Sequence, residues 1–337
     1  MLLVVTAAED ATAEAVVARL RTRGIEPLRF DPADFPARAR LSLAFDARGA
    51  ARATLHTASD RIELHRLSAI WFRRPGVPEP DAQVHDARLR RYIAAECAGH
   101  LDDVWDALAC RCFPATPLTI LRAETKASQL ALAGALGFEL PPTLFTTEPA
   151  DFLDFHRRHA GRIVSKVAGP AFNRHYGPDL GRYSEIVSTR DVGYADAVRF
   201  APSIFQAYVD KRIELRVTVV GGQVFAAEIH SQATRRTRHD WRRYDLAHTP
   251  HRRHALPRDI AQRCVVLVRR LGLAYGAIDL VLTPDGRYVF LEINPNGQYL
   301  WIEQLTGLPI SEAIAEWLMH REPAEHAQVH DTEGACA

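Results

Sequence analysis

The chain has 337 residues, of which 47% are hydrophobic, so it is long enough for two or three domains with sizeable cores. Its 42 Lys and Arg residues nearly balance its 41 Asp and Glu residues, which excludes a global charge field that would favour bulk nucleic-acid or membrane binding. The five cysteines lack zinc-type spacing, and the sequence has neither a signal peptide nor an apolar run of about 18 residues. We therefore expect a cytoplasmic protein with reduced thiols that binds no nucleic acid and no membrane.

The first 117 residues predict a domain that begins with a strand, a helix and a second strand. An apolar run at 2–6 precedes helical spacing at 11–23, and a β-prone segment follows at 27–30. This βαβ start lacks the Gly-x-Gly-x-x-Gly pattern of dinucleotide sites, which favours a scaffold or peptide-docking role. Further strands, a long helix and a linker are expected at 41–45, 53–55, 69–72, 82–109 and 114–117.

Two lysines in the next segment are candidates for phosphate binding. Lys126 lies near the start of a helix expected at 122–136, and Lys166 lies on a short strand expected at 162–167. The glycine-bearing loop 168–181 follows that strand, and an ammonium group beside flexible backbone N–H groups is one way to hold phosphates. The loop is not a P-loop, because it lacks Gly-x-x-x-x-Gly-Lys. Lys126 on its own is more typical of a solvated surface charge.

The last third begins with a strand expected at 203–209 and a hairpin at 214–221 and 223–228. Glu214 and Arg216 lie two residues apart and therefore share one strand face. Between 235 and 254 the chain contains seven arginines, which indicate either a solvated loop or a site for phosphate and carboxylate groups. Two helices and a loose tail are expected at 256–271, 311–321 and 322–337.

The stretch 277–298 predicts a metal-binding hairpin. Two β-prone runs flank a Pro-Asp-Gly turn, and Asp279 and Glu292 stand among apolar neighbours where aliphatic residues are expected. Carboxylates that converge with the amide of Asn294 would repel one another unless a hard cation such as Mg²⁺ lay between them. A surface hairpin with ordinary solvated charges is the alternative.

The turn of this hairpin decides whether the two carboxylates meet. A two-residue turn at Asp285 and Gly286 pairs Asp279 with Glu292, with their Cβ atoms roughly 4.5 to 5.5 Å apart. A type I turn with a bulged Gly286 shifts the pairing by one residue and turns Glu292 away. Both turns fit the sequence.

Taken in order, these features resemble the ATP-grasp superfamily over roughly 121–318. The resemblance implies ATP and Mg²⁺ as cofactors and an α/β (α+β) fold with a Rossmann-like pre-ATP-grasp domain at 1–117. A central α+β subdomain at 118–203, a C-terminal antiparallel-sheet subdomain at 204–321 and a flexible tail would follow. The resemblance implies that Lys126 and Lys166 bind phosphate, that Gln206, Ala207, Tyr208 and Val209 bind adenine, and that Glu214 binds ribose. It also implies that Asp279, Glu292 and Asn294 bind the metal. This metal set requires Asp279 and Glu292 on one face of the hairpin, through the two-residue pairing or through a bulge that restores it.

Within the superfamily, the chain is most similar to the peptide maturases that make graspetides such as the microviridins. The similar stretches begin at Glu214 (ELRVTV), Asp240 (DWRRYD) and Phe290 (FLEINPNGQ), and one at Ile70 (IWFRRP) extends the resemblance over nearly the whole chain. The loop after Lys166 departs from the family pattern, because it is richer in Phe, Asn and His than in Gly.

This resemblance implies a reaction. ATP phosphorylates a Glu or Asp side chain of a ribosomal precursor peptide, and a Ser, Thr or Lys side chain of the same peptide displaces phosphate to close an ester or amide ring. Arg216 and Arg242 would offset charge on the transferring phosphoryl group and the acceptor carboxylate. His230 and His239 are candidate bases, although a solvent-exposed histidine is the more usual interpretation of each. A homodimer that docks the leader peptide on surfaces within 152–200 is expected.

Two other functions use the same residues. A glutathione-synthetase-like ligase would join a small amino acid or peptide to a carboxylate, and a nucleotide-binding regulatory protein would carry out no chemistry. A short neighbouring gene with a Thr- and Glu- or Asp-rich core would favour the maturase.

Overall fold

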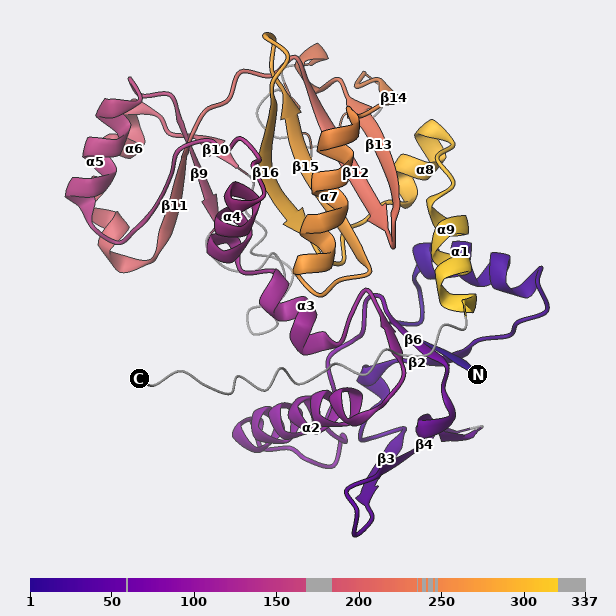
Figure 1. The fold of residues 1–337 in the computed structure, drawn as a ribbon. Coiled ribbons are helices and arrows are strands. Elements are labelled where there is room, and N and C mark those ends of the chain that lie inside the picture. The colour runs from indigo at the N-terminus through magenta and orange to yellow at the C-terminus, as the bar shows by residue number, and fades with distance from the viewer. Residues whose placement is uncertain are drawn as a thin grey trace, which may run out of the picture.

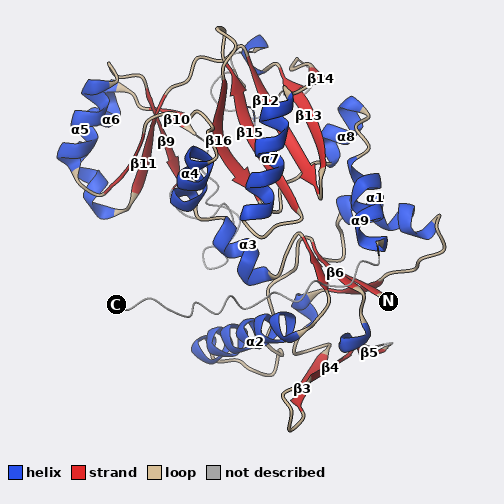
Figure 2. Ribbon diagram, viewed as in Figure 1, coloured by secondary structure: helices blue, strands red, loops and turns tan. Residues whose placement is uncertain are grey.

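The computed structural model describes residues 1–320 apart from Ser59 and positions 168–183, 235, 238–240, 242–244 and 246–247. Figure 1 shows a small parallel sheet near the N-terminus, a second sheet beside α5 and α6, and a larger sheet behind α7. Figure 2 shows the same arrangement of helices and strands by type. Within the described residues, no helix is long and apolar enough to cross a membrane.

The N-terminal region is built on a parallel sheet. Its strand order is β2-β1-β6-β7, with β2 at Leu28–Phe30, β1 at Leu2–Val5, β6 at Ala69–Phe72 and β7 at Arg111–Phe113. The sequence did not predict β7, because three residues are too few to show a period. A separate antiparallel sheet contains β3 (Arg40–Phe45), β4 (Ala51–His56) and β5 (Arg61–Glu63).

Helices cover both faces of the parallel sheet. Helix α1 (Ala11–Arg21) begins after Asp10, whose carboxylate accepts hydrogen bonds from two backbone N–H groups of the first turn. Helix α2 (Ala87–Ala107) begins after Asp86 in the same way, five residues later than the expected start at 82. On the α2 face, Trp105 packs with Phe30 and Phe72. The other face packs against α1 and the C-terminal helix α9 (Ile310–Met319).

The central region contains an antiparallel sheet in the order β10-β9-β11-β8. The helix expected at 122–136 is two helices, because Thr125 adopts an extended backbone that ends one and precedes the other. Four elements, β8, α5, β10 and α6, lie where the sequence predicted an extended segment or no element. The bounds are α3 Pro117–Ala123, α4 Lys126–Ala135, β8 Thr143–Thr146, α5 Pro149–Arg158, β9 Ile163–Val167, β10 Glu185–Ile186, α6 Thr189–Gly193 and β11 Ser203–Ala207.

The C-terminal region is a five-stranded antiparallel sheet in the order β14-β13-β12-β15-β16. Strands β12 and β13 pair across Gly221 and Gly222, as the sequence predicted, and Gly221 has a positive φ of 59°. The expected terminal helix at 311–321 is α9, and α8 was not predicted. The bounds are β12 Ile213–Val220, β13 Gln223–Ile229, β14 His251–Arg253, α7 Arg258–Arg270, β15 Tyr275–Leu282, β16 Tyr288–Asn294 and α8 Leu300–Thr306. Short 3₁₀ helices lie at Pro32–Asp34, Leu64–Arg66, Ala195–Phe200 and Ser231–Ala233.

Strand alternation separates an apolar face of the large sheet from a polar one. Leu215 and Val217 of β12 and Ile278 and Leu280 of β15 pack in one core with α7. The intervening residues therefore point to the other face. Both β12 and β15 are buried along their whole length, so the charged residues on the second face lie inside the protein.

Candidate functional site

Three charged residues form a row across the polar face of the large sheet. Arg216 on β12 pairs in register with Asp279 on β15, and Asp279 pairs with Glu292 on β16. Arg216 and Asp279 are 4% and 8% exposed, and Arg216 Nη1 lies 2.9 Å from each Asp279 carboxylate oxygen. Buried charges of this kind need close partners, and the row supplies them.

The hairpin that carries Asp279 and Glu292 combines both predicted geometries. At the turn, Thr283 pairs with Arg287 and Gly286 has a φ of 89°, so the two-residue turn is wrong and the pairing is shifted by one residue. Between Leu280 and Asp279 the register shifts again, which leaves Leu291 as an extra residue. This bulge returns Glu292 to its place opposite Asp279, so the expected pair is present.

Lys126 reaches the same row from the first turn of α4. Its Nζ lies 2.5 Å from Glu292 Oε2. The buried side chain of Gln129 holds α4 against β16, because it donates to the carbonyl oxygen of Ile293 and accepts from its N–H, with distances of 2.8 and 3.2 Å. Gln129 was not singled out in the sequence, since an amide on a helix carries no signal of its distant partner.

Glu214 lies two residues before Arg216 on the same face and is 5% exposed. Burial raises the pKa of its carboxyl above the usual range, while Lys211 and Ser231 oppose that shift. Lys211 Nζ lies 3.0 Å from Glu214 Oε1, and both side chains are 7% exposed. Sequence reasoning missed Lys211, although its position three residues before Glu214 was a usable signal.

A pocket joins this face to the central sheet. Lys166 enters it from β9, and the segment after β11 supplies its other wall, so that most of the expected nucleotide-binding residues meet here. Gln206 is buried, and its side-chain amide donates to Thr143 Oγ1 at 2.9 Å. The pocket is lined by Val164, Lys166, Ser184, Gln206, Ala207, Tyr208, Val209, Lys211, Glu214, Trp241, Asp279, Val281, Leu291 and Glu292.

Asn294 ends β16 and begins a loop that passes over Arg216. Asn294 Oδ1 accepts a hydrogen bond from the backbone N–H of Asn296 at 3.1 Å. The Gln298 carbonyl oxygen accepts from Arg216 Nη2 at 3.3 Å. A Cβ atom on Gly297 would lie 2.5 Å from Arg216 Nη2, so only glycine allows this approach.

The donor set fits Mg²⁺ that shares its coordination with phosphate. Asp279, Glu292 and Asn294 have carboxylate and amide oxygens as possible ligands, which hard cations prefer, and Mg²⁺ is usually bound by one or two carboxylates together with substrate phosphates. Among the described residues there is no cluster of three or more His, Cys, Asp or Glu side chains suited to hold a metal.

Three further residues were expected at this site, namely Arg242, His239 and His230. Arg242 and His239 lie outside the described residues. His230 hydrogen-bonds to Glu228 at 2.8 Å. Glu228 pairs with Leu215 on β12, and the side chain of Leu215 packs on the α7 face of the sheet. The hydrogen-bond partner of His230 therefore lies on the α7 face, opposite the face that carries Arg216.

Comparisons with known proteins find one matching family model and several similar solved structures. A family model described as the MvdD pre-ATP grasp domain matches residues 1–118. The structure is similar to the macrocyclase MdnC of Microcystis aeruginosa, solved with precursor peptide MdnA, at 30% identity over 94% of this chain and 98% of that one, with a TM-score of 0.81. The macrocyclase MdnB of the same organism is 31% identical over 94% and 98% of the two chains, with a TM-score of 0.77.

A third similar structure is a RiPP-associated ATP-grasp ligase of Chryseobacterium gregarium in complex with ADP and a leader and core peptide. It is 27% identical over 96% of this chain and 97% of that one, with a TM-score of 0.84. A comparison with curated proteins finds no match. Because the likeness to MdnC and MdnB covers nearly all of each chain at 30% identity or more, this protein belongs to the graspetide family of ATP-grasp peptide maturases.

Proposed function

We propose that this protein is an ADP-forming ligase that closes ester or amide rings in a ribosomal precursor peptide. The observation that carries the proposal is the Arg216–Asp279–Glu292 row beside a pocket that also receives Lys166. The relatives support it, since MdnC was solved with its precursor peptide and the Chryseobacterium ligase with ADP and a leader and core peptide.

The reaction has two balanced steps. A side-chain carboxylate oxygen of the peptide forms a bond to the γ-phosphorus of ATP, the bond from that phosphorus to the bridging oxygen breaks, and ADP leaves. A hydroxyl or amine of the same peptide then forms a bond to the acyl carbon, inorganic phosphate leaves, and the nucleophile loses its proton. Each ring therefore costs one ATP, and the peptide loses one water.

The residues of the row have distinct proposed roles. Asp279, Glu292 and Asn294 would hold Mg²⁺, which when bound screens the charge of the phosphates and makes the γ-phosphorus more electrophilic. Lys126 and Arg216 already lie against the two carboxylates, so they are placed to neutralise phosphate and acceptor carboxylate as these groups enter. Arg242 is proposed to act with Arg216.

The nucleotide is proposed to lie in the pocket between the sheets. The segment Gln206, Ala207, Tyr208 and Val209 would contact the base, and Val281 and Leu291 supply apolar surface for it. Lys166 would bind phosphate, and Glu214 would accept from the ribose. The bulge contributes directly to this pocket, because it brings both Leu291 and Glu292 to its wall.

We propose domains at 1–117, 118–203 and 204–321 and a cytoplasmic homodimer. The leader peptide would dock on the central subdomain. Support for that surface comes from exposed large apolar side chains there, namely Leu153, Ile186, Tyr194 and Phe200. Light scattering of the purified protein tests the dimer.

The deciding experiment incubates the protein with ATP, Mg²⁺ and the precursor peptide encoded beside its gene. We expect the peptide to lose one water mass per ring and one ADP and one phosphate to form for each ring. Loss of water without ADP would overturn the acylphosphate route. ADP formation that needs a free amino acid in place of the peptide would support the small-molecule ligase instead, and no nucleotide turnover with any acceptor would support the regulatory protein.

A further inference from the structure

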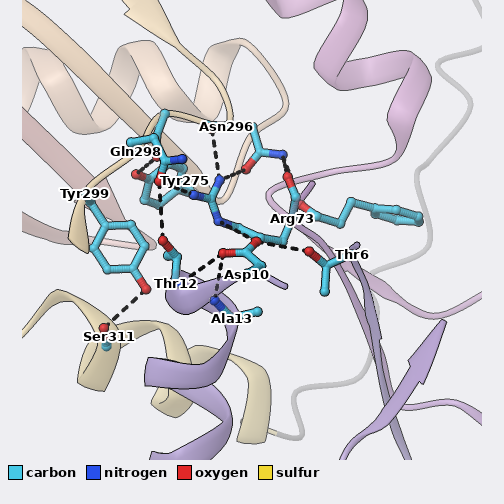
Figure 3. Close-up of polar contacts among 12 residues, drawn as sticks. Thr6, Asp10, Thr12, Ala13, Arg73, Tyr275, Asn296, Gln298, Tyr299 and Ser311 are labelled. Atoms are coloured by element: carbon cyan, nitrogen blue, oxygen red, sulfur yellow. Dashed lines mark hydrogen bonds and ion pairs between the residues drawn. The ribbon is translucent and has the colours of Figure 1, made fainter. Parts of the chain in front are cut away.

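A buried arginine links the N-terminal domain to the loop beyond the metal hairpin. Arg73 directly follows β6 and is 2% exposed. Its guanidinium donates to Gln298 Oε1 at 2.5 Å and to the Asn296 carbonyl oxygen at 3.3 Å. Figure 3 shows the Arg73 side chain reaching toward Asn296 and Gln298, with Asp10 nearby. We call Asp10, Arg73, Asn296 and Gln298 the Arg73 junction.

Hydrogen bonds across the junction are donated from both sides, by the loop and by the N-terminal domain. The Asn296 side-chain amide donates to the Arg73 carbonyl oxygen at 2.5 Å and to that of Phe72 at 3.2 Å. Thr12 in the first turn of α1 donates to Gln298 Oε1 at 3.3 Å. Two side chains of the loop are therefore held by the ends of two elements of the N-terminal domain, namely β6 and α1.

The same loop holds two residues of the candidate site. The Asn296 backbone N–H donates to Asn294 Oδ1, and the Gln298 carbonyl oxygen accepts from Arg216. Tyr275 donates to the Gly297 carbonyl oxygen at 2.7 Å. A displacement of this loop therefore moves partners of Asn294 and Arg216 together.

The buried charges at the junction are a poor means of stabilising the fold. The Arg73 guanidinium is almost fully buried, and Asp10 Oδ2 lies 3.6 Å from its Nε, which has no hydrogen-bond partner among the described residues. Asp10 also caps α1 through two backbone N–H groups. A buried ion pair with incomplete hydrogen bonding is often less stabilising than apolar residues of similar volume. The residues at the junction are therefore better suited to hold the loop in position than to stabilise the fold.

We propose that Arg73 is a positioning residue that, through Asn296 and Gln298, sets the orientation of Asn294 and Arg216. The N-terminal domain thereby completes the catalytic site without touching substrate. This inference rests on the proposed metal role of Asn294 and the proposed catalytic role of Arg216. Groups that orient metal ligands typically change metal affinity or activity by about 10- to 100-fold when they are removed.

The test uses the full chain with Arg73→Met, Gln298→Leu and the double variant. Arg111→Met is the matched control, because Arg111 donates from β7 to the carbonyl oxygens of Trp317 and His320 at the end of α9. It removes another guanidinium between the N-terminal region and α9, away from the loop. Two quantities are measured for each protein: turnover with the precursor peptide, and ADP affinity with and without Mg²⁺.

We expect Arg73→Met and Gln298→Leu each to lower kcat about tenfold or more, and the double variant to lose no more than the worse single variant. The Mg²⁺-dependent gain in ADP affinity should fall in the same variants, while affinity without Mg²⁺ stays unchanged. Arg111→Met should lower thermal stability and leave both quantities as in the wild type. Arg73→Lys keeps the positive charge but loses the planar guanidinium that donates to both Gln298 and Asn296. It should therefore behave like Arg73→Met.

A loss of thermal stability in Arg73→Met with wild-type kcat and Mg²⁺ dependence would overturn the inference, as would full activity of Arg73→Lys. The proposed function fails in a different way. In that case the wild type shows no turnover with the precursor peptide, and the Mg²⁺ dependence of ADP binding still decides whether Arg73 positions the site.

Discussion

Lys126 Nζ lies 2.5 Å from Glu292 Oε2, although 166 positions separate the two residues. Both side chains are about one-quarter exposed, so the pair lies at the edge of the buried row rather than inside it. The contact places a proposed phosphate-binding cation against a proposed metal ligand. A site that binds a metal and a phosphate together needs these two groups side by side.

The first prediction is that replacing Glu292 affects turnover much more than the stability of the fold. Glu292→Gln should reduce turnover with the precursor peptide by at least about a hundredfold, because an amide neither offsets the metal charge nor binds it as well. The free energy of unfolding should change by less than about 1 kcal/mol, as is usual for a partly exposed ion pair. Steady-state ADP release and urea denaturation measure the two effects.

Asp285→Asn is the matched control for that variant. Asp285 is a carboxylate of the same hairpin, but it lies at the exposed turn and pairs with Arg287. Its replacement should leave turnover unchanged. Equal losses in the two variants would contradict the metal role of Glu292.

The second prediction concerns the close approach of the loop to Arg216. Gly297→Ala should lower turnover and destabilise the fold by about 1–3 kcal/mol, since the added methyl overlaps well-packed neighbours. The overlapping positions are Arg216 Nη2 at 2.5 Å and Ala277 Cβ at 2.6 Å. Kinetics and thermal unfolding provide the measurements.

Gly99→Ala provides the comparison. Gly99 lies within α2, and apart from its own helix no atom of the described residues lies within 4 Å of an added Cβ. This variant should be more stable than the wild type by about 0.5–1 kcal/mol, because alanine is the better helix former. Normal turnover and stability in Gly297→Ala would show that the loop can move away from Arg216.

The third prediction concerns Arg216 and Asp279. Arg216→Met leaves the Asp279 carboxylate buried without its guanidinium partner, and loss of one partner of a buried pair typically costs about 3–5 kcal/mol. Turnover should be abolished as well. Adding Asp279→Asn should recover part of the stability, because the buried charge is gone, and none of the turnover. Urea denaturation at neutral pH measures the stabilities, and an additive loss in the double variant would contradict the pairing.

The fourth prediction follows from the raised pKa of Glu214. Its pKa is higher in the folded protein than the usual value of 4.5, chiefly because of burial, so the folded state keeps this proton to a higher pH than the unfolded state. The contribution of Glu214 to stability is therefore complete below pH 4.5 and is lost as pH rises through the folded pKa. Relative to the wild type, Glu214→Gln should become increasingly stable over that interval, as urea denaturation at several pH values would show.

The pKa of Asp285 is shifted in the opposite direction from that of Glu214, so its effect on stability has the opposite pH dependence. A hydrogen bond from Arg287 lowers its pKa to about 2, so its contribution is present above the usual value of 3.8 and lost as pH falls toward 2. Asp285→Asn should therefore reduce the loss of stability in acid. A difference between the wild type and Glu214→Gln that does not change with pH would show that the pKa of Glu214 is the same in the folded and unfolded states.

Local pattern was sufficient for the parts of the site that lie within one strand or one hairpin. The alternation of strands placed Glu214 beside Arg216, and apolar flanks marked Asp279 and Glu292 as unusual. The paired strands across Gly221 and Gly222 follow from local turn chemistry in the same way. These features depend on neighbours a few residues apart, so the sequence contains them.

Tertiary structure decided the contacts between distant segments. The bulge at Leu291 combined two turn geometries that the sequence left open, because its position depends on how β16 packs against its neighbours. Gln129 and Arg73 reach partners 164 and 225 residues away, and no local period reports such partners. The sequence by itself determined the chemistry of the charged row and the family to which it belongs. Only the fold decided which cation meets which carboxylate, because those pairings depend on burial and on the packing of elements remote in the chain.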